Sequence, residues 1–129
     1  MIDIGNRGLK LWIPGHPVPQ PRMTQKNKWK FATHPIWGWR NLVAWSVKAM
    51  RDDSWPLPKG HRVGMGLLFR AVPNHGQVGD LDNYIKGVKD ALSKIVYHND
   101  RQVRYYIEPT GIERVEEKAQ EGLRLVIQW

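Results

Sequence analysis

The sequence predicts a single α/β (α+β) domain over residues 1–129, with one mixed β-sheet flanked by two helices in the order β-α-β-α-β-β. Two stretches repeat apolar residues at steps of three and four, which is typical of helices with one buried face. Shorter stretches alternate apolar and other residues, which is typical of strands. The length suits one hydrophobic core, and no repeat or long linker divides the chain.

The first half of the chain is expected to hold a strand, a loop, a helix and a second strand. Residues 9–14 form a short apolar strand, and the proline-rich residues 14–21 are an extended loop, because proline lacks the amide donor that a helix needs. Residues 36–51 predict a helix, and residues 63–71 alternate as a strand. The apolar face of this helix comprises Ile36, Trp39, Val43, Val47 and Met50.

The second half is expected to begin with a loop over residues 73–79 and a helix over residues 82–94. Residues 103–108 and 123–129 predict the last two strands. The core side of the second helix comprises Leu81, Tyr84, Ile85, Val88, Leu92 and Ile95.

Charge is distributed unevenly along the chain. Residues 1–62 contain eleven Lys and Arg against three Asp and Glu, whereas residues 63–129 contain nine of each. This asymmetry favours a polyanionic partner, most often nucleic acid, over a basic surface with no specific partner. The residues expected to contact DNA are Arg22, Lys26, Lys28, Lys30 and Arg40, interleaved with Trp29, Phe31, Trp37 and Trp39. Helical tryptophans such as Trp39 and Trp45 are instead expected to pack in the core.

Three further features narrow the class of protein. The chain has no cysteine, which excludes disulfides and zinc–thiolate sites and suits a reducing compartment. No apolar run is long enough to cross a membrane, and the first residues lack a signal-peptide pattern. A cytoplasmic protein is therefore expected.

Three aspartates and a lysine form the most informative pattern. Asp80 and Asp82 are two residues apart, so in an extended segment both carboxylates point the same way and can face one cation. Lys86 lies one helical turn beyond Asp82, where it could stabilise charge on a phosphate. Asp100, in a later turn, could complete a site for Mg²⁺ or Mn²⁺. These residue types on a basic chain suggest a metal-dependent enzyme that acts on nucleic acid.

A structural reading of the same residues needs no metal. An aspartate at a helix start stabilises the helix by capping it, and Asp100 could be an ordinary turn former. Lys86 could pair with Asp82 or Asp90. Spacing alone leaves both readings open.

The chain resembles RusA-type Holliday-junction resolvases over most of its length. The resemblance rests on Gly79-Asp80-Leu81-Asp82-Asn83, Lys86, Lys89-Asp90-Ala91-Leu92, Asn99-Asp100-Arg101-Gln102-Val103 and the upstream Pro14-Gly15-His16-Pro17-Val18-Pro19-Gln20-Pro21-Arg22. It implies a homodimeric, Mg²⁺-dependent endodeoxyribonuclease that cuts four-way DNA junctions by paired symmetric incisions in recombination and repair. The family is frequent in phage and prophage genomes.

Within this resemblance, Asp80, Asp82 and Asp100 correspond to the catalytic, metal-binding acids, and Lys86 to the catalytic lysine. Asp90 belongs to the motif and is expected to have a supporting role. Asn99 departs from the family, many members of which have a first aspartate there. Two alternatives are a metal-dependent nuclease that prefers flaps or other branched DNA, and a catalytically inactive junction-binding protein.

Overall fold

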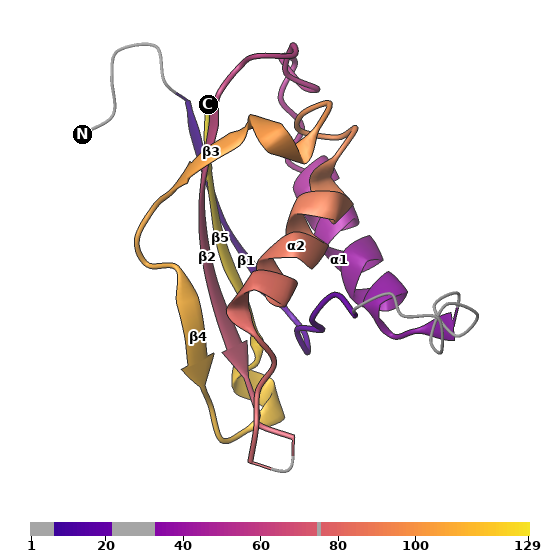
Figure 1. Ribbon diagram of the computed structural model, residues 1–129, viewed down its shortest axis with the longest axis vertical. Helices are drawn as coiled ribbons and strands as arrows, with labels where there is room; N and C mark the ends of the chain where they lie inside the picture. Colours follow the sequence, from indigo (N-terminus) through magenta and orange to yellow (C-terminus); the bar gives the residue numbers. More distant parts are fainter. Residues whose placement is uncertain (1–6, 22–32, 75) are drawn as a thin grey trace.

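The computed structural model describes residues 7–21, 33–74 and 76–129. Along these residues the order is β-α-β-α-β-β-β, with two short 3-10 helices (Figure 1). The elements are β1 (Gly8–Pro14), α1 (Ile36–Lys48), β2 (Val63–Ala71), α2 (Leu81–Leu92), η2 (Asp100–Gln102), β3 (Val103–Tyr106), β4 (Gly111–Arg114), η3 (Lys118–Gln120) and β5 (Gly122–Gln128).

The strands form one mixed five-stranded sheet, so the predicted fold class is confirmed. The order is β1-β5-β2-β3, and β5 pairs antiparallel with both neighbours. The other edge of β2 is shared by two parallel partners, β3 along its first half and β4 along its second. β4 is the one strand of the described residues that the sequence did not predict, since its four residues are all at least partly exposed and carry no alternating pattern.

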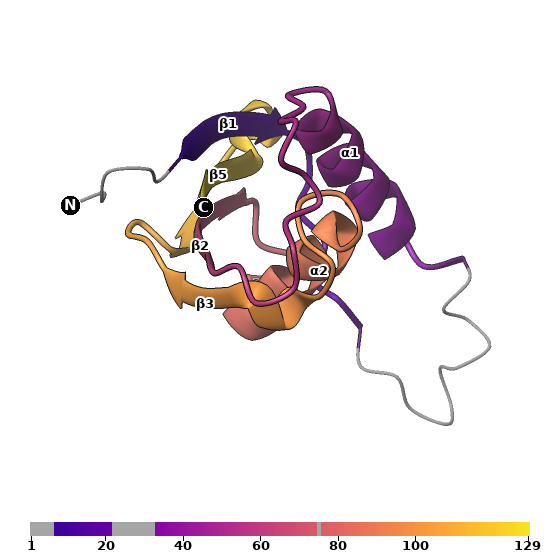
Figure 2. The ribbon, with the colours of Figure 1, turned by 90° about the horizontal axis from the view of Figure 1, so that it is seen from above.

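Both helices cover the same face of the sheet (Figure 2). Alternation explains why this face is apolar, since every second residue of β2, from Val63 to Ala71, is buried against the helices. Leu123, Leu125 and Ile127 of β5 are buried on the same face. The helices supply Ile36, Trp39, Val43 and Val47 from α1 and Tyr84, Ile85, Val88, Ala91 and Leu92 from α2. This two-layer core fixes α2 above the edge of the sheet where β3 and β4 lie.

Two predictions for the first helix were wrong. Trp45 was expected in the core, but it is 67% exposed, and Lys48 Nζ lies 5.1 Å from the centre of its ring. It follows the buried Val43 by two residues, which places it on the opposite side of the helix. Met50 is 47% exposed, because α1 ends at Lys48 before it can contribute to the buried face.

Glu121 is a buried carboxylate at the start of β5. Its Oε2 accepts a hydrogen bond of 3.0 Å from the backbone N–H of Val72 and lies 2.6 Å from His16 Nδ1, which donates because a carboxylate oxygen can only accept. Glu121 therefore joins the loop after β1, the end of β2 and the start of β5. No helix of the described residues is long and apolar enough to cross a membrane.

Candidate active site

The first turn of α2 presents Asp80 and Asp82. Asp80 is the N-cap residue, with extended backbone angles, and its carbonyl oxygen accepts hydrogen bonds from Asn83 N and Tyr84 N. Its carboxylate makes no capping hydrogen bond, so the capping explanation for this aspartate is not supported. Asp82 already lies inside the helix, which corrects the expectation that both aspartates share an extended segment.

Both carboxylates are exposed, and neither makes a hydrogen bond or an ion pair within the described residues. Asp82 and Lys86 share a helix face, yet no ion pair joins them. The first turn of α2 thus carries two negative charges that the described part of the protein leaves uncompensated.

The proline-rich segment positions this turn. Gln20 N donates to Asn83 O at 2.9 Å, and Pro19 packs on Gly79 so closely that a Cβ at Gly79 would lie 2.9 Å from Pro19 Cγ. A larger residue at position 79 would separate the two segments. Glu121 bonds to the beginning of the same proline-rich segment and to the residue that follows β2. It therefore anchors both the segment that packs on Gly79 and the loop that leads to Asp80.

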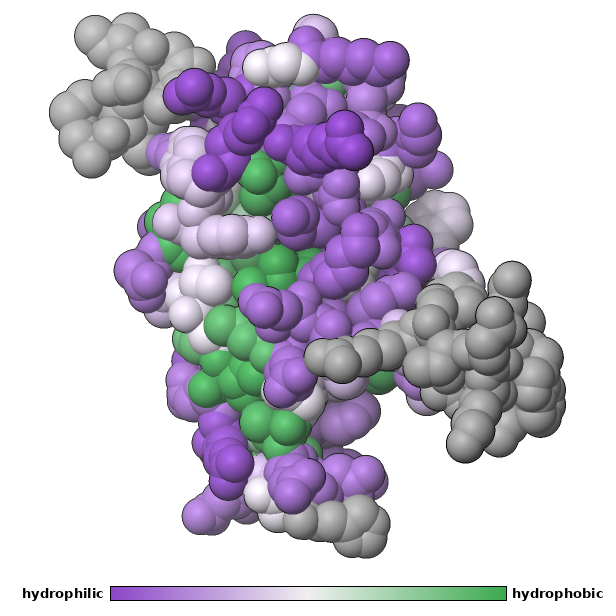
Figure 3. Space-filling view, viewed as in Figure 1, coloured by the Kyte–Doolittle hydropathy of each residue, from purple (hydrophilic) through white to green (hydrophobic). Residues whose placement is uncertain are grey.

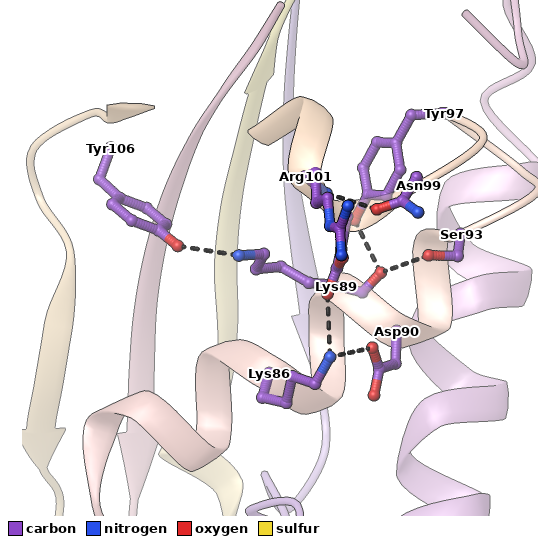
Figure 4. A network of polar contacts seen from close by, with 9 residues as sticks. Lys86, Lys89, Asp90, Ser93, Tyr97, Asn99, Arg101 and Tyr106 are labelled. Carbon is purple, nitrogen blue, oxygen red and sulfur yellow. Dashed lines mark hydrogen bonds and ion pairs between the residues drawn. The ribbon is translucent and has the colours of Figure 1, made fainter. Parts of the chain in front are cut away.

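Lys86 lies between two carboxylates (Figure 4). Its Nζ is 2.9 Å from Asp90 Oδ1, one helical turn along α2, and 2.9 Å from Asp100 Oδ2, at the start of η2. The lysine side chain is half exposed, and each carboxylate is one quarter exposed. Residues fourteen positions apart are therefore joined into a fixed cluster.

The pKa values follow from this pairing. The hydrogen bond to Asp100, and then the one to Asp90, raises the pKa of Lys86, and burial opposes this shift. The hydrogen bond from Lys86 lowers the pKa of Asp100. The lysine is therefore a permanent cation at neutral pH, and Asp100 is a permanent anion.

Two hydrogen bonds stabilise η2 and the turn that leads to it from α2. The phenol of Tyr97 donates to the carbonyl of Lys89 at 2.7 Å, and burial keeps this phenol protonated by raising its pKa. Asn99 caps η2 by accepting a hydrogen bond from Arg101 N at 2.8 Å. This capping gives Asn99 a structural role at the position where it departs from the family pattern.

The structure brings part of the predicted site together. Lys86 and Asp100 are in direct contact, with Asp90 as a third member, whereas Asp80 and Asp82 stand at the first turn without a bond to them. Among the residues that the structure describes, no three Asp, Glu, His or Cys side chains are grouped closely enough to hold a metal ion.

Lys89 is a further cation on this face that sequence reasoning left without a role. Its Nζ lies 3.4 Å from the Tyr106 hydroxyl and 6.0 Å from the centre of that ring (Figure 4). The helical spacing of Lys86 and Lys89 could have indicated it, but the contact with β3 could not be read from spacing. The surface over α2 is mainly hydrophilic, and hydrophobic residues gather toward β2 and β4 (Figure 3).

Of the residues expected to contact DNA, the structure describes Arg40 alone. Its guanidinium lies 4.7 Å from the centre of the Trp37 ring, a cation–π contact that holds the side chain on α1. The other four, Arg22, Lys26, Lys28 and Lys30, lie outside the described residues, as do Trp29 and Phe31.

A basic chain that exposes carboxylates beside a fixed lysine has the features of a phosphodiester-cleaving protein that acts on nucleic acid. Residues 14–117 match the profile of the endodeoxyribonuclease RusA family, so the match includes both helices and the whole candidate site. The chain belongs to this family of endodeoxyribonucleases, which act on branched DNA at Holliday junctions. A search of curated proteins found no match.

Proposed function

We propose that this protein is a Mg²⁺-dependent, structure-selective endodeoxyribonuclease that resolves four-way junctions by paired symmetric incisions as a homodimer. The arrangement along α2 carries the proposal. Two exposed carboxylates without partners in the described structure, Asp80 and Asp82, stand at the start of the helix. Asp82 precedes by one helical turn Lys86, which Asp90 and Asp100 hold in place.

The oxygen atoms on this face suit a hard divalent cation. Mg²⁺ prefers carboxylate oxygens and keeps several waters, so two carboxylates and a substrate phosphate oxygen are enough to bind it. Asp80 and Asp82 are accessible, and Asp100 retains Oδ1, because its bond to Lys86 uses Oδ2. When bound, the ion would lower the pKa of a water molecule and offset negative charge on the scissile phosphate.

Lys86 contributes positive charge rather than a basic amine. Its raised pKa keeps it protonated at neutral pH, so it cannot accept a proton from the attacking water. Its bonds to Asp90 and Asp100 fix the ammonium group before substrate arrives, and such preorganised charge stabilises negative charge that develops at a phosphate. Asp90 accordingly positions Lys86.

Paired incision supports the homodimer. Two cuts in strands of like polarity across a four-way junction need two equivalent sites, which a twofold-symmetric dimer provides. The described part of one subunit has one α2 and one candidate site. The proposal therefore requires that both cuts follow a single binding event.

A plasmid that extrudes a cruciform tests these statements together. With Mg²⁺, wild type should convert the supercoiled plasmid directly into linear product, because both strands are cut before the protein dissociates. EDTA should abolish the reaction, and Asp82→Asn should slow it by more than about 100-fold while leaving junction binding intact. Cleavage products are measured on a gel.

The control is Asp53→Asn, which removes a second exposed aspartate, in the connection between α1 and β2, and should cut like wild type. Accumulation of nicked circles would contradict paired incision. Faster cutting of a flap substrate than of the junction would favour a general branched-DNA nuclease. Tight binding without cleavage, under any divalent metal, would favour an inactive junction-binding protein.

A further inference from the structure

A concave site rich in positive charge lies beside η2, and two of its lining residues, Asn99 and Arg101, are the chain neighbours of Asp100. This cavity has a volume of about 280 Å³ and is lined by Lys59, Gly60, Asn99, Arg101, Gln102 and Arg104. Three of these six residues are cations, and none is an acid. They come from the connection before β2, from η2 and from β3.

None of the three cations forms an ion pair within the described residues, although Arg101 is close enough to help lower the pKa of Asp100. Across residues 7–21, 33–74 and 76–129, no carboxylate lies within ion-pair distance of Lys59, Arg101 or Arg104, whereas Lys86 is paired twice. Like charges around one concavity repel each other, and an anion placed among them would relieve that repulsion. The cavity is thus electrostatically suited to an anion and unsuited to a metal ion.

The two walls of the cavity are held together by one buried side chain. Gln102, 6% exposed, donates from Nε2 to Pro58 O at 2.9 Å and to His61 O at 3.1 Å. Its Oε1 accepts from His98 N and Asn99 N. These bonds fix the segment that carries Lys59 against the turn that carries Arg101, so the site is already formed without a ligand.

The backbone at the mouth of the cavity also has a special conformation. Gly60 has φ +89°, and no other atom lies within 4 Å of where its Cβ would be. Residues with a side chain rarely adopt this conformation, so the glycine lets the chain turn sharply between Lys59 and the start of β2.

The position of the cavity identifies its ligand. Asp100 stands between two lining residues, Asn99 and Arg101, in consecutive positions of the chain. A DNA strand whose scissile phosphate reached Lys86 and Asp100 would carry a neighbouring phosphate close to this cavity. Since one water occupies about 30 Å³ of liquid, the volume admits a phosphate group with its hydration.

We propose that Lys59, Arg101 and Arg104 form a phosphate site that binds the DNA backbone next to the scissile phosphate. The inference rests on the proposed function, since it places the substrate strand beside Asp100. Guanidinium groups bind phosphate oxygens in pairs, and the ammonium of Lys59 adds a point charge. The site fixes the register of the strand on the protein and reads no base sequence.

The test measures junction binding in EDTA, so that it does not depend on cleavage. A fluorescent four-way junction is titrated at several salt concentrations with wild type and with the double variant Lys59→Gln/Arg104→Gln. The slope of log K against log [salt] should become shallower by about 0.9 for each DNA phosphate that the variant no longer neutralises. The matched control is Lys118→Gln/Arg114→Gln, which removes the same charges from exposed positions in η3 and β4 and should keep the wild-type slope.

Two further measurements separate the alternatives. The charge-retaining variant Lys59→Arg/Arg104→Lys should have the wild-type slope. If the glutamine variant lost its slope through misfolding, retaining the charge would not be expected to restore it. Inorganic phosphate, at constant ionic strength, should raise the melting temperature of wild type more than that of the double glutamine variant.

An unchanged slope in Lys59→Gln/Arg104→Gln would overturn the proposal. A double glutamine variant that loses the melting-temperature rise with inorganic phosphate but binds the junction as tightly as wild type would also overturn it. The site would then bind free phosphate and not DNA. An equally shallow slope in the control pair would also overturn it, by showing an effect of net charge alone. If cleavage is absent but the slope changes as expected, the proposed function fails and this site stands.

Discussion

The first turn of α2 and its middle both carry aspartate, but in the described structure only the one in the middle has a charged partner. At the first turn, Asp80 and Asp82 are exposed and have no partner among the described residues. In the middle, Lys86 contacts Asp90 of the same helix and Asp100 of η2, each at 2.9 Å. The helix therefore holds two carboxylates without partners in the described structure, next to a lysine that has two.

This difference suggests a division of labour between the two regions. Carboxylates without partners can bind a cation without breaking an existing bond. Carboxylates bound to a lysine would have to divide their oxygens between the lysine and the added cation. We expect the first turn to respond to added metal, and the middle of the helix to respond to removal of its own charged side chains. Asp100 is the residue where the two responses meet, because one of its oxygens is paired and the other is free.

The largest expected effect is on stability with and without Mg²⁺. If the ion binds the native state, its free energy of unfolding rises by about 2.7 kcal/mol when the ion is present at 100 times its dissociation constant. We expect this rise in wild type and in Asp90→Asn, and its absence in Asp82→Asn. Urea unfolding at increasing Mg²⁺ measures it. An equally small rise in Asp90→Asn and Asp82→Asn would remove the distinction between the two regions.

The next effect is the coupling energy across Lys86. A double-mutant cycle with Lys86→Met and Asp100→Asn should give a coupling of about 0.2–1 kcal/mol, the usual range for an ion pair that water can reach. The same cycle with Lys86→Met and Asp82→Asn should give no measurable coupling, since no bond joins those residues. Both cycles are measured in EDTA. A larger coupling to Asp82 than to Asp100 would reverse the assignment.

The smallest effect is the pH dependence of that pair. Asp100 has a lowered pKa, so its contribution is present above the ordinary value of 3.8 and is lost as pH falls through the lower, folded-state value. Lys86 has a raised pKa, so its contribution is present below 10.5 and is lost as pH rises through the higher, folded-state value.

The stability difference between wild type and Asp100→Asn should therefore be constant from about pH 5 to 9 and should shrink below about pH 4 and above about pH 11. Urea unfolding of both proteins across pH, without metal, measures this difference. A difference that changes between pH 6 and 8 would require another titrating group near the cluster.

Local patterns predicted most of the fold. The second strand was predicted over residues 63–71 and is observed as Val63–Ala71, because its inward residues are all apolar. β4 was missed because it depends on β2 for its pairing and has no pattern of its own. Trp45 was misplaced because it was judged by its hydrophobicity, whereas the spacing of Trp39, Val43 and Val47 puts it on the opposite side of α1.

The candidate site was predicted less completely than the fold. Spacing within one helix gave Asp82, Lys86 and Asp90 on one face, and it raised the pairing of Lys86 with Asp90 as one alternative. It could not give the bond to Asp100, which depends on how the chain returns after α2. The proposed phosphate site had no sequence signal, because its walls come from segments about forty residues apart in the chain, joined in part by Gln102.

The place of β5 in the sheet has a consequence for the order of folding. β5 is the last strand in sequence, yet it lies between β1 and β2, so the sheet has no centre until residues 122–128 are added. Contacts between segments so far apart in sequence close late and slow the folding of a domain. A nascent chain would thus carry α2 and its aspartates before it carried the strand that completes the core, and nuclease activity would begin only after β5 had inserted.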